Sequence, residues 1–403
     1  MVRKNAVNRE LKSIPGGVCA PAGFKANGVF CGIKESETEK DFGVIYSERK
    51  CPTAAVFSTS VIQGAPVMVS KERVKDGYAQ AIVFNSGNAN VFQENGGKVA
   101  QQTISLVAKQ LKIDDNDILI ASTGKIGEAL QVSLFENSVK NLVDGLKESD
   151  EHSQKAKDVL NAGERLAKQL SFSFELGDYT CRIGAIFKGS MHVSPNMATF
   201  LCFITTDVNI SSEMLQRALS AEAKESFNLL DIDGVSSPND MVCIMANGRA
   251  GNAKIDCVDS EYKKFCAVLH ETAVKICEEL TLSDDIVKPF ACEVIGVKSK
   301  QVSRAIARRI VGLDALKSAF SRLEIDVDAL LYAVVDVGVE IEMSRLTITL
   351  HSQNGKLVVF EGGKKLLLSK ERVAEILQAD KIKSCLNFES GNYSSKAFGC
   401  FYK

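Results

Sequence analysis

The sequence contains no tryptophan and only four histidines among its 403 residues. None of its twelve cysteines stands in a C-x-x-C pair, and the histidines lie far apart along the chain. Structural zinc sites need clustered Cys and His ligands, so we expect no metal site. No run approaches the roughly 20 apolar residues that a membrane-spanning helix requires. These absences argue against a zinc protein and against a membrane protein.

The chain also lacks an excess of charge of either sign. Its 49 basic residues balance 50 acidic ones to a formal net charge of −1, which argues against nucleic acid or an anionic membrane as a partner. The first seventeen residues, MVRKNAVNRELKSIPGG, include basic side chains but no apolar core typical of a secretory signal. Single cysteines within apolar runs are typical of buried thiols in a reducing compartment. We therefore expect a cytoplasmic protein without a disulfide framework.

The pattern of apolar residues predicts alternating strands and helices. Apolar residues make up 45% of the sequence and charged residues 25%, as in a globular protein with a large core. Strands are expected at 54–57, 80–85, 117–121, 171–175, 179–187, 200–207, 241–246 and 290–297. Helices are expected at 97–111, 134–146, 153–170, about 212–230, 260–280 and 301–311, and a β-meander over 331–360 turns at Asn354-Gly355. This alternation predicts a layered α/β (α+β) fold in which mixed sheets pack with helices.

The most informative segment begins at Lys188 and ends in an apolar run after Thr199. A loop rich in Gly, Ser and Pro leads directly into a strand here, and Thr199 stands at the junction. A threonine hydroxyl becomes an effective nucleophile if its own backbone nitrogen is freed as an α-amine, which can then act as the base. Cleavage of the Ala198–Thr199 bond would divide the chain into residues 1–198 and 199–403. His192, seven residues earlier, is a second candidate base, although a packing role is the simpler interpretation.

Three polar loops are candidates for the walls of a site. The segment from Asn85 to Asn90 and the segment from Ser122 to Gly127 each follow an apolar strand. The first could be a pocket wall or a structural turn. Backbone N–H groups around Gly124, together with the Thr123 hydroxyl, could form an oxyanion hole, whereas a phosphate-binding glycine motif is absent. The acidic loop from Asp231 to Asp240 lacks the spacing of a calcium loop and could line a polar pocket or form a plain turn.

Taken together and in this order, these segments resemble the ornithine acetyltransferase family of arginine biosynthesis. The resemblance also includes the segments 22–28, 32–34, 54–59 and 64–67, and it extends over most of residues 16–300. It implies the architecture of a self-processing acyltransferase with an N-terminal threonine. Residues 1–198 would become an α chain and residues 199–403 a β chain, assembled as an α2β2 heterotetramer.

The resemblance also implies a reaction and the residues that perform it. Thr199 would take an acetyl group from N-acetylornithine and pass it to glutamate through an acetyl-threonine intermediate. Thr123 and Gly124 match the family's oxyanion positions, and Lys188 matches a lysine that contacts the substrate. The transfer needs no cofactor, with acetyl-CoA as a further candidate donor.

The segments that would bind the amino-acid substrate depart from the family pattern. In place of the family's Thr-Thr-Asp-Thr segment, this chain has Val-Leu-Asn-Ala-Gly-Glu at residues 159–164. Asp284 stands where the family has a glutamate that binds the substrate. The family's C-terminal Asn and Thr or Ser have no counterpart before Lys403. The resemblance therefore favours acetyl transfer from N2-acetylornithine to glutamate and leaves two alternatives open. One is a self-processing N-acyl transferase or amidohydrolase with another substrate, and the other is a relative without catalytic activity.

Overall fold

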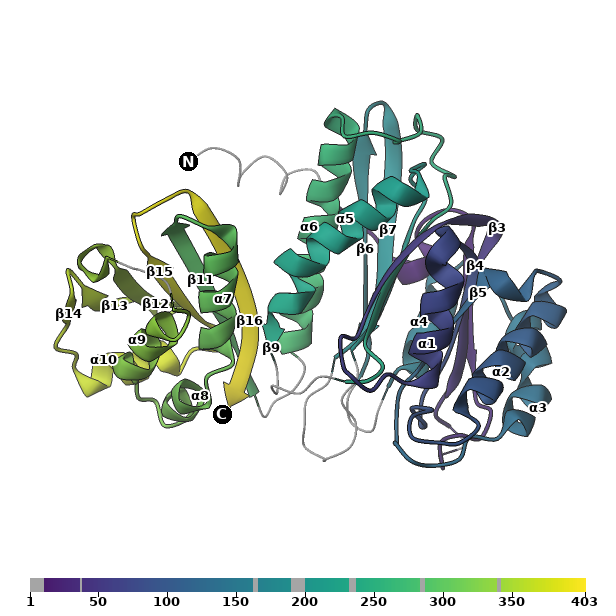
Figure 1. Ribbon diagram of the computed structural model, residues 1–403, viewed down its shortest axis with the longest axis horizontal. Coiled ribbons are helices and arrows are strands. Elements are labelled where there is room, and N and C mark those ends of the chain that lie inside the picture. Colours follow the sequence, from purple (N-terminus) through teal and green to yellow (C-terminus); the bar gives the residue numbers. More distant parts are fainter. Residues whose placement is uncertain are drawn as a thin grey trace. The chain divides into compact units, whose positions relative to one another are not determined.

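The chain divides into two units of unequal size (Figure 1). The structure, a computed structural model, describes residues 11–36, 38–161, 166–189, 200–231, 237–282, 287–338 and 342–403. The first unit consists of Met1–Ala221 and Val235–Thr272, and the second consists of Glu222–Gly234 and Ala273–Lys403. Within the described ranges, no helix combines the length and the apolar content needed to cross a bilayer.

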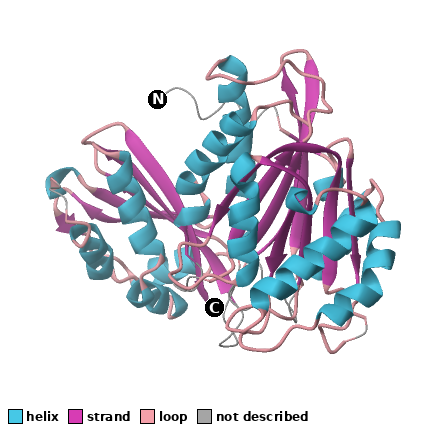
Figure 2. Ribbon diagram, turned by 45° about the vertical axis from the view of Figure 1, so that its right-hand side comes forward, coloured by secondary structure: helices cyan, strands magenta, loops and turns pink. Residues whose placement is uncertain are grey.

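The first unit is built on one mixed sheet. Its described strands follow the order β1 (Lys12–Ser13), β6 (Lys168–Leu176), β7 (Tyr179–Lys188), β8 (Leu201–Thr206), β10 (Met241–Ala246), β3 (Phe42–Phe57), β4 (Tyr78–Asn85) and β5 (Ile118–Ser122), while β2 (Phe24–Val29) pairs with β3. The pairs β8–β10 and β4–β5 are parallel, and the other pairs are antiparallel. The predicted mixed sheet is confirmed (Figure 2).

The long strand β3 makes the sheet fold back over itself. Its first part, Phe42–Tyr46, pairs with β4, and its last part, Thr53–Phe57, pairs with β10. As a result, side chains from the two ends of the sheet meet in one buried cluster. The ring of Phe84 in β4 lies 4.9 Å, between centroids, from the ring of Phe203 in β8. One buried cluster of the first unit therefore lies between two parts of a single sheet.

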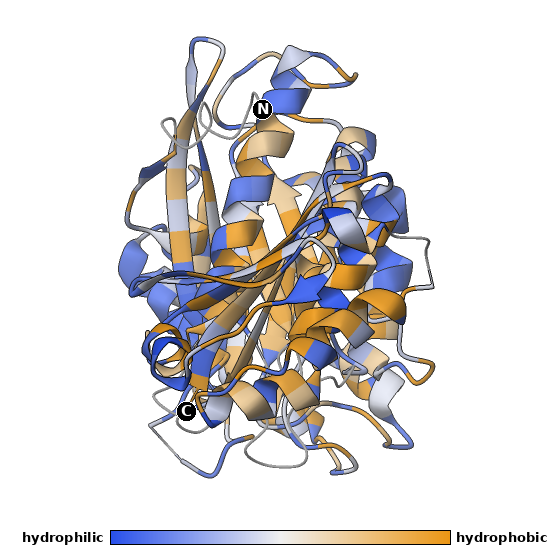
Figure 3. Cartoon of the chain, turned by 90° about the vertical axis from the view of Figure 1, so that its left-hand side faces the viewer, coloured by the Kyte–Doolittle hydropathy of each residue, from blue (hydrophilic) through white to orange (hydrophobic). Residues whose placement is uncertain are grey.

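Two helices, α2 (Gly96–Leu111) and α3 (Val132–Asp144), cover the outer face of β4. Further helices of this unit are α1 (Ala65–Arg73) and α4 (Asp150–Val159), and α5 (Ser212–Glu225) and α6 (Ser260–Thr281) begin in it. Ile104 and Val107 of α2 share a buried cluster with Val83 of β4, whereas Ile82 and Phe84 belong to the other cluster. Successive strand residues point to opposite faces, so β4 contributes to both cores. Figure 3 shows apolar residues along the strands and along the helix faces.

The second unit has a sheet of its own with helices packed on it. Its described strands follow the order β14 (Lys364–Lys365), β13 (Gly355–Glu361), β12 (Thr347–Ser352), β15 (Ile382–Asn387), β11 (Val287–Val297), β16 (Tyr393–Tyr402) and β9 (Leu230–Asp231). The helices are α7 (Lys300–Val311), α8 (Asp314–Ser321), α9 (Val327–Val335) and α10 (Lys370–Leu377). Phe320 of α8 contacts Phe290 of β11 edge to face at 5.1 Å between ring centroids. The layered α/β prediction is therefore confirmed for both units.

Three predicted elements are wrong in type or extent. The helix expected over 153–170 ends at Val159, and β6 begins at Lys168. The helix expected to continue to about residue 230 ends at Glu225. The meander expected from residue 331 begins only at Thr347, because 327–335 form α9, whose N-terminus is capped by the Asp326 side chain. The turn at Asn354-Gly355 is confirmed by the pairing of β12 with β13.

The predicted division between residues 198 and 199 falls within the first unit. It lies between β7 and β8, which pair in the antiparallel sense from Lys188–Leu201 to Ile183–Thr206. The prediction therefore describes a cleavage site within one folding unit and not a boundary between two units. The division itself stays a prediction.

Candidate active site

Two loops that follow parallel neighbouring strands meet at one edge of the first unit's sheet. Because β4 and β5 run parallel, the loops after Asn85 and Ser122 leave the same edge. The Ser122 hydroxyl donates to Asn85 Oδ1 at 2.6 Å, and the Thr123 N–H donates to the Asn85 carbonyl at 3.0 Å. The Lys125 N–H donates to the Gly87 carbonyl at 3.1 Å. The structure brings together two of the polar loops that the sequence singled out.

Gly124 lies where these loops approach each other most closely. Its φ of +137° is one that residues with a side chain rarely adopt. A Cβ at this position would lie 2.2 Å from the carbonyl carbon of Gly87, so only glycine fits. Within the described part of the chain, no acceptor pairs with the Gly124 N–H. An uncommitted backbone donor of this kind is what an oxyanion hole requires.

Lys188 brings a positive charge to the same loop from β7. Its Nζ donates to Thr123 Oγ1 at 2.9 Å, and the two residues are only 6% and 1% exposed. The Thr123 hydroxyl accepts this bond and can still donate its own proton to another group. Charge interacts more strongly in such a buried environment than at the surface. Lys188, Thr123 and Gly124 therefore form one cluster of potential donors, although the sequence separates Lys188 from the other two.

A cavity of about 390 Å³ adjoins this cluster. Three lysines, Lys34, Lys125 and Lys188, and two glutamates, Glu35 and Glu39, line it. Ser86, Gly87, Thr123 and Asn161 are among its other lining residues. The volume suits a small molecule, and the lining offers groups of both charge signs to it.

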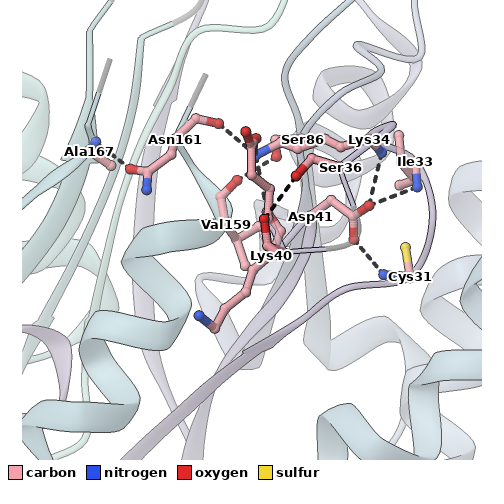
Figure 4. A network of polar contacts seen from close by, with 12 residues as sticks. Cys31, Ile33, Lys34, Ser36, Lys40, Asp41, Ser86, Val159, Asn161 and Ala167 are labelled. Carbon is pink, nitrogen blue, oxygen red and sulfur yellow. Dashed lines mark hydrogen bonds and ion pairs between the residues drawn. The ribbon is translucent and has the colours of Figure 1, made fainter. Parts of the chain in front are cut away.

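Asp41 shapes the loop that forms one wall of the cavity. The carboxylate is fully buried and accepts four backbone hydrogen bonds, from the N–H groups of Cys31, Gly32, Ile33 and Lys34, at 2.6, 3.1, 2.7 and 3.0 Å. Figure 4 shows this carboxylate at the centre of the loop. Burial and the nearby Asp41 charge raise the pKa of the Cys31 thiol. Asp41 therefore fixes the backbone that presents Lys34.

The Lys34 side chain joins this loop to the segment after α4. Its Nζ donates to the carbonyl oxygens of Asn161 at 2.7 Å and Lys40 at 3.1 Å, and it forms an ion pair with Glu39 at 3.4 Å. Burial lowers the pKa of Lys34, while Glu39 opposes this shift. Asn161, the last described residue of the altered segment, lines the cavity, and its side chain accepts the Ala167 N–H at 2.7 Å (Figure 4).

Four of the predicted site residues, Ala198, Thr199, His192 and Asp284, lie outside the described residues. The structure does describe Phe200, the residue bonded to Thr199. The Phe200 N–H donates to Asp240 Oδ1 at 2.7 Å, and its carbonyl accepts the Met241 N–H at 3.0 Å. Phe200 directly precedes Leu201, which pairs with Lys188. The backbone that follows Thr199 is therefore anchored in the same sheet as Lys188.

The sequence alone did not reveal the backbone contacts of the Asp41 and Asp240 side chains. Asp41 lies seven to ten residues after the N–H groups that it binds, and no local motif marks such a contact. The sequence did place Asp240 in a polar loop, but it gave no sign of the contact with Phe200. Within the described residues, no group of three or more His, Cys, Asp or Glu side chains could hold a metal ion. All twelve cysteines lie within the described residues, and none of them forms a disulfide.

The matching family model and the sequence relatives agree on one family. The model of the ArgJ family matches residues 25–402. The arginine biosynthesis bifunctional protein ArgJ 1 of Clostridium acetobutylicum is 32% identical over 379 residues, which cover 94% of this chain and 92% of that protein. An ArgJ protein of Caldanaerobacter subterraneus is 32% identical, with 97% of this chain and 96% of its own length covered. A glutamate N-acetyltransferase of Methanothermobacter thermautotrophicus is 31% identical, with 97% and 95% covered.

Proposed function

The chain belongs to the ArgJ family, and from that premise we propose that it transfers the acetyl group of N2-acetylornithine to glutamate in arginine biosynthesis. The names of its relatives, an arginine biosynthesis bifunctional protein and a glutamate N-acetyltransferase, support acyl transfer as the reaction. The observation that carries the proposal is the buried cluster of Lys188, Thr123 and Gly124 beside the cavity. In acyl transfer, a carbonyl oxygen becomes negative, and such donors stabilise it.

The nucleophile in this proposal is Thr199. It is bonded to Phe200, whose neighbour Leu201 pairs with Lys188. The chain therefore joins Thr199 to the strand that lies beside the donor cluster. Thr123 and Gly124 stabilise the oxyanion, and Lys188 holds the Thr123 hydroxyl and contacts the substrate. Asp284, with Lys188 and Thr199, would contribute to substrate binding.

Activation of Thr199 requires cleavage of the Ala198–Thr199 bond. The Thr199 hydroxyl attacks the Ala198 carbonyl, its proton passes to the departing amide nitrogen, and the acyl group moves from nitrogen to oxygen. Water then hydrolyses this ester. The products are an Ala198 carboxylate and a Thr199 with a free hydroxyl and a free α-amine, which serves as the base.

Turnover repeats the same chemistry on the substrate in two steps. The Thr199 hydroxyl attacks the acetyl carbonyl of N2-acetylornithine, and its proton leaves with the ornithine amine while an acetyl ester remains on Thr199. The α-amine of glutamate then attacks the ester and loses a proton to the base. The base passes this proton to the departing Thr199 oxygen, which regenerates the hydroxyl and releases N-acetylglutamate. Each step develops one oxyanion, so one donor cluster serves both.

The charges of the cavity suit this pair of substrates. Ornithine ends in an ammonium group and glutamate in a carboxylate, and a single site must accept both in turn. The lining could supply Lys34 and Lys125 to an anionic group, and Glu35 and Glu39 to a cationic group, if the substrate replaces one partner of the Lys34–Glu39 and Lys125–Glu35 ion pairs, of 3.4 and 3.8 Å. A cavity lined by charges of only one sign would reject one of the two substrates.

We further propose that the cleaved chains stay together as an α2β2 heterotetramer in the cytoplasm. Acetyl transfer itself would need no cofactor, and acetyl-CoA is a candidate alternative donor. Assaying acetyl-CoA in place of acetylornithine tests this point directly.

The intact mass of the purified protein is the first test. We expect two polypeptides, of residues 1–198 and 199–403, and an added acetyl group on the second after incubation with acetylornithine alone. Glutamate should remove that group and yield N-acetylglutamate. Thr199→Ala should remain full length and inactive, whereas Thr199→Ser should retain part of both activities.

The same measurements separate the competing functions. Release of acetate without any response to glutamate would indicate an amidohydrolase with a different substrate. A full-length wild-type protein that is indistinguishable from Thr199→Ala would contradict the role of Thr199 and would favour a non-catalytic relative.

A further inference from the structure

We propose that Asn239 and Asp240 are a positioning pair that holds the nucleophile's strand and the oxyanion loop in a fixed relation. The inference rests on the role proposed for Thr199. Nothing in the reaction described above requires these two side chains to touch the substrate. They act through the backbone on either side of them.

Asp240 fixes the residue that directly follows Thr199. The Asp240 carboxylate accepts the Phe200 N–H at 2.7 Å, and the next residue, Met241, donates its N–H to the Phe200 carbonyl at 3.0 Å. The parallel pairing of β8 with β10 begins one residue later, at Leu201 and Met241. The Asp240 side chain thereby continues the ordered contacts of β8 to the peptide that joins Thr199 to Phe200.

Asn239 fixes the proposed oxyanion loop. Its Nδ2 donates to the carbonyl of Ser122 at 3.0 Å and to the carbonyl of Ala89 at 2.6 Å, and the residue is 1% exposed. Ser122 directly precedes Thr123, and Ala89 belongs to the loop that follows β4. One amide group thus ties both polar loops together.

The segment that carries the pair is itself held firmly. The Ser58 N–H donates to the Asp240 carbonyl at 2.8 Å, and the Gly64 N–H donates to the Pro238 carbonyl at 3.1 Å. A Cβ on Gly64 would lie 1.8 Å from Asn239 Oδ1, so the amide occupies space that only a glycine leaves free. Such close packing restricts the Asn239 side chain.

Adjacent residues therefore connect the two parts of the proposed centre. Consecutive Cα atoms are about 3.8 Å apart, so a displacement of Asp240 is transmitted to Asn239 over a single peptide. In this proposal, the connection fixes Phe200, the residue bonded to Thr199, relative to the loop that begins at Ser122. A misplacement of about 1 Å can lower a rate by roughly 100-fold.

The test compares Asp240→Ala with Asp240→Asn. We expect Asp240→Ala to slow self-cleavage and to lower kcat by up to about 100-fold, with KM for acetylornithine unchanged. Asp240→Asn keeps an oxygen that can accept the Phe200 N–H and should restore most of both rates. If Asp240 only supported the fold, its loss would not lower kcat while leaving KM unchanged. Nor would Asp240→Ala and Asp240→Asn then differ in rate.

Asp207 provides the matched control at the other end of β8. Its carboxylate also accepts backbone hydrogen bonds, from the Arg182 N–H at 2.7 Å and the Ala22 N–H at 3.3 Å. Asp207→Ala should lower the thermal midpoint but leave the cleavage rate and kcat of the folded protein at their wild-type values. If Asp207→Ala slows cleavage as much as Asp240→Ala, the special role of Asp240 is wrong.

Asn239→Ala tests whether the two residues act as a unit. We expect the double variant Asn239→Ala/Asp240→Ala to be little slower than the slower single variant. Either substitution alone already removes the fixed relation between Phe200 and the oxyanion loop. Wild-type rates in Asp240→Ala would overturn this inference alone, since acetyl transfer would continue. A wild-type chain that never cleaves would instead overturn the role of Thr199, and this inference with it.

Discussion

The ammonium group of Lys188 donates a hydrogen bond of 2.9 Å to the hydroxyl of Thr123, although the two residues lie 65 positions apart. The contact joins the end of β7 to the loop after β5. It orients the hydroxyl, because an oxygen that accepts from an ammonium group turns its own proton elsewhere. In the proposed reaction, that proton faces the developing oxyanion.

Thr123→Val keeps the shape of the side chain and removes the hydroxyl. We expect kcat for acetyl transfer to fall by about 10²- to 10³-fold, the loss typical of one oxyanion donor. Thr123→Ser retains the hydroxyl and should keep most of the activity. Initial rates of N-acetylglutamate formation measure the effect, and a valine variant with the wild-type rate would show that the hydroxyl takes no part.

Gly124→Ala should prevent correct formation of the loop. The new Cβ would meet the Gly87 backbone at 2.2 Å, in addition to the strain of a φ of +137°. Gly127→Ala is the matched control, since Gly127 also has a positive φ, of +81°, but no atom within 4 Å of an added Cβ. We expect the control to lose about 1–2 kcal/mol of stability and still cleave.

The readout for both glycine variants is the thermal midpoint together with the fraction of cleaved chain. Gly124→Ala should accumulate as uncleaved protein or fail to fold. If both variants cleave at the same rate, the close approach of Gly124 to Gly87 has no bearing on the reaction.

Asp41→Ala should destabilise the first unit more than the loss of an ordinary surface carboxylate. Four backbone N–H groups lose their acceptor, and a hydrogen bond to a charged group contributes about 1.5–3 kcal/mol. Because water replaces some of these bonds, we expect a loss of about 3 kcal/mol or more in urea unfolding. The KM for acetylornithine should also rise, because Lys34 lies on the same loop.

Asp114→Ala is the comparison for Asp41. The Asp114 carboxylate accepts a single backbone N–H, from Asn116, at an exposed position. Its loss should cost about 1 kcal/mol or less. Equal costs for the two variants would mean that the four bonds to Asp41 do not act together.

His152 should make stability depend on pH. Burial and the neighbouring charge of Lys155 lower its pKa in the folded protein, so the unfolded chain takes up a proton first as the pH falls. The stability from the neutral ring is complete above the usual pKa of about 6.5, and it is lost as the pH falls through the folded value. Urea midpoints measured from about pH 7.5 downward should decline less steeply in His152→Gln. An unchanged slope would assign the pH dependence to other groups.

The sequence was sufficient to predict the strands that carry the site. Alternating and continuous apolar residues mark β4, β5, β7, β8 and β10, and their polar ends mark the loops after Asn85 and Ser122. Contact between those two loops follows from the parallel pairing of β4 and β5. No pattern in the sequence predicts this pairing. The partners of Asp41 and Asp240 depend on the path of the chain in three dimensions, so no local pattern reveals them.

The error at α9 has a local physical cause. The apolar residues from Leu331 to Val335 fit a strand as well as a helix, because short apolar runs do not distinguish the two. The deciding residue is Asp326, whose side chain caps the helix by accepting the Ala329 N–H at 2.9 Å. An aspartate at the N-cap position, shortly before the apolar run, is the sequence signal that indicates this helix.

The strand order of the first unit has a consequence for biosynthesis. β8 and β10 follow residue 199 in the chain, yet they lie in the sheet between β7 and β3, which precede it. If the two segments were translated from separate messages, β7 and β3 would each lack a neighbour, and so would β8 and β10. Unpaired strand edges promote aggregation. In the proposed reaction, a single polypeptide avoids this hazard, because its strands can pair before the Ala198–Thr199 bond is cleaved.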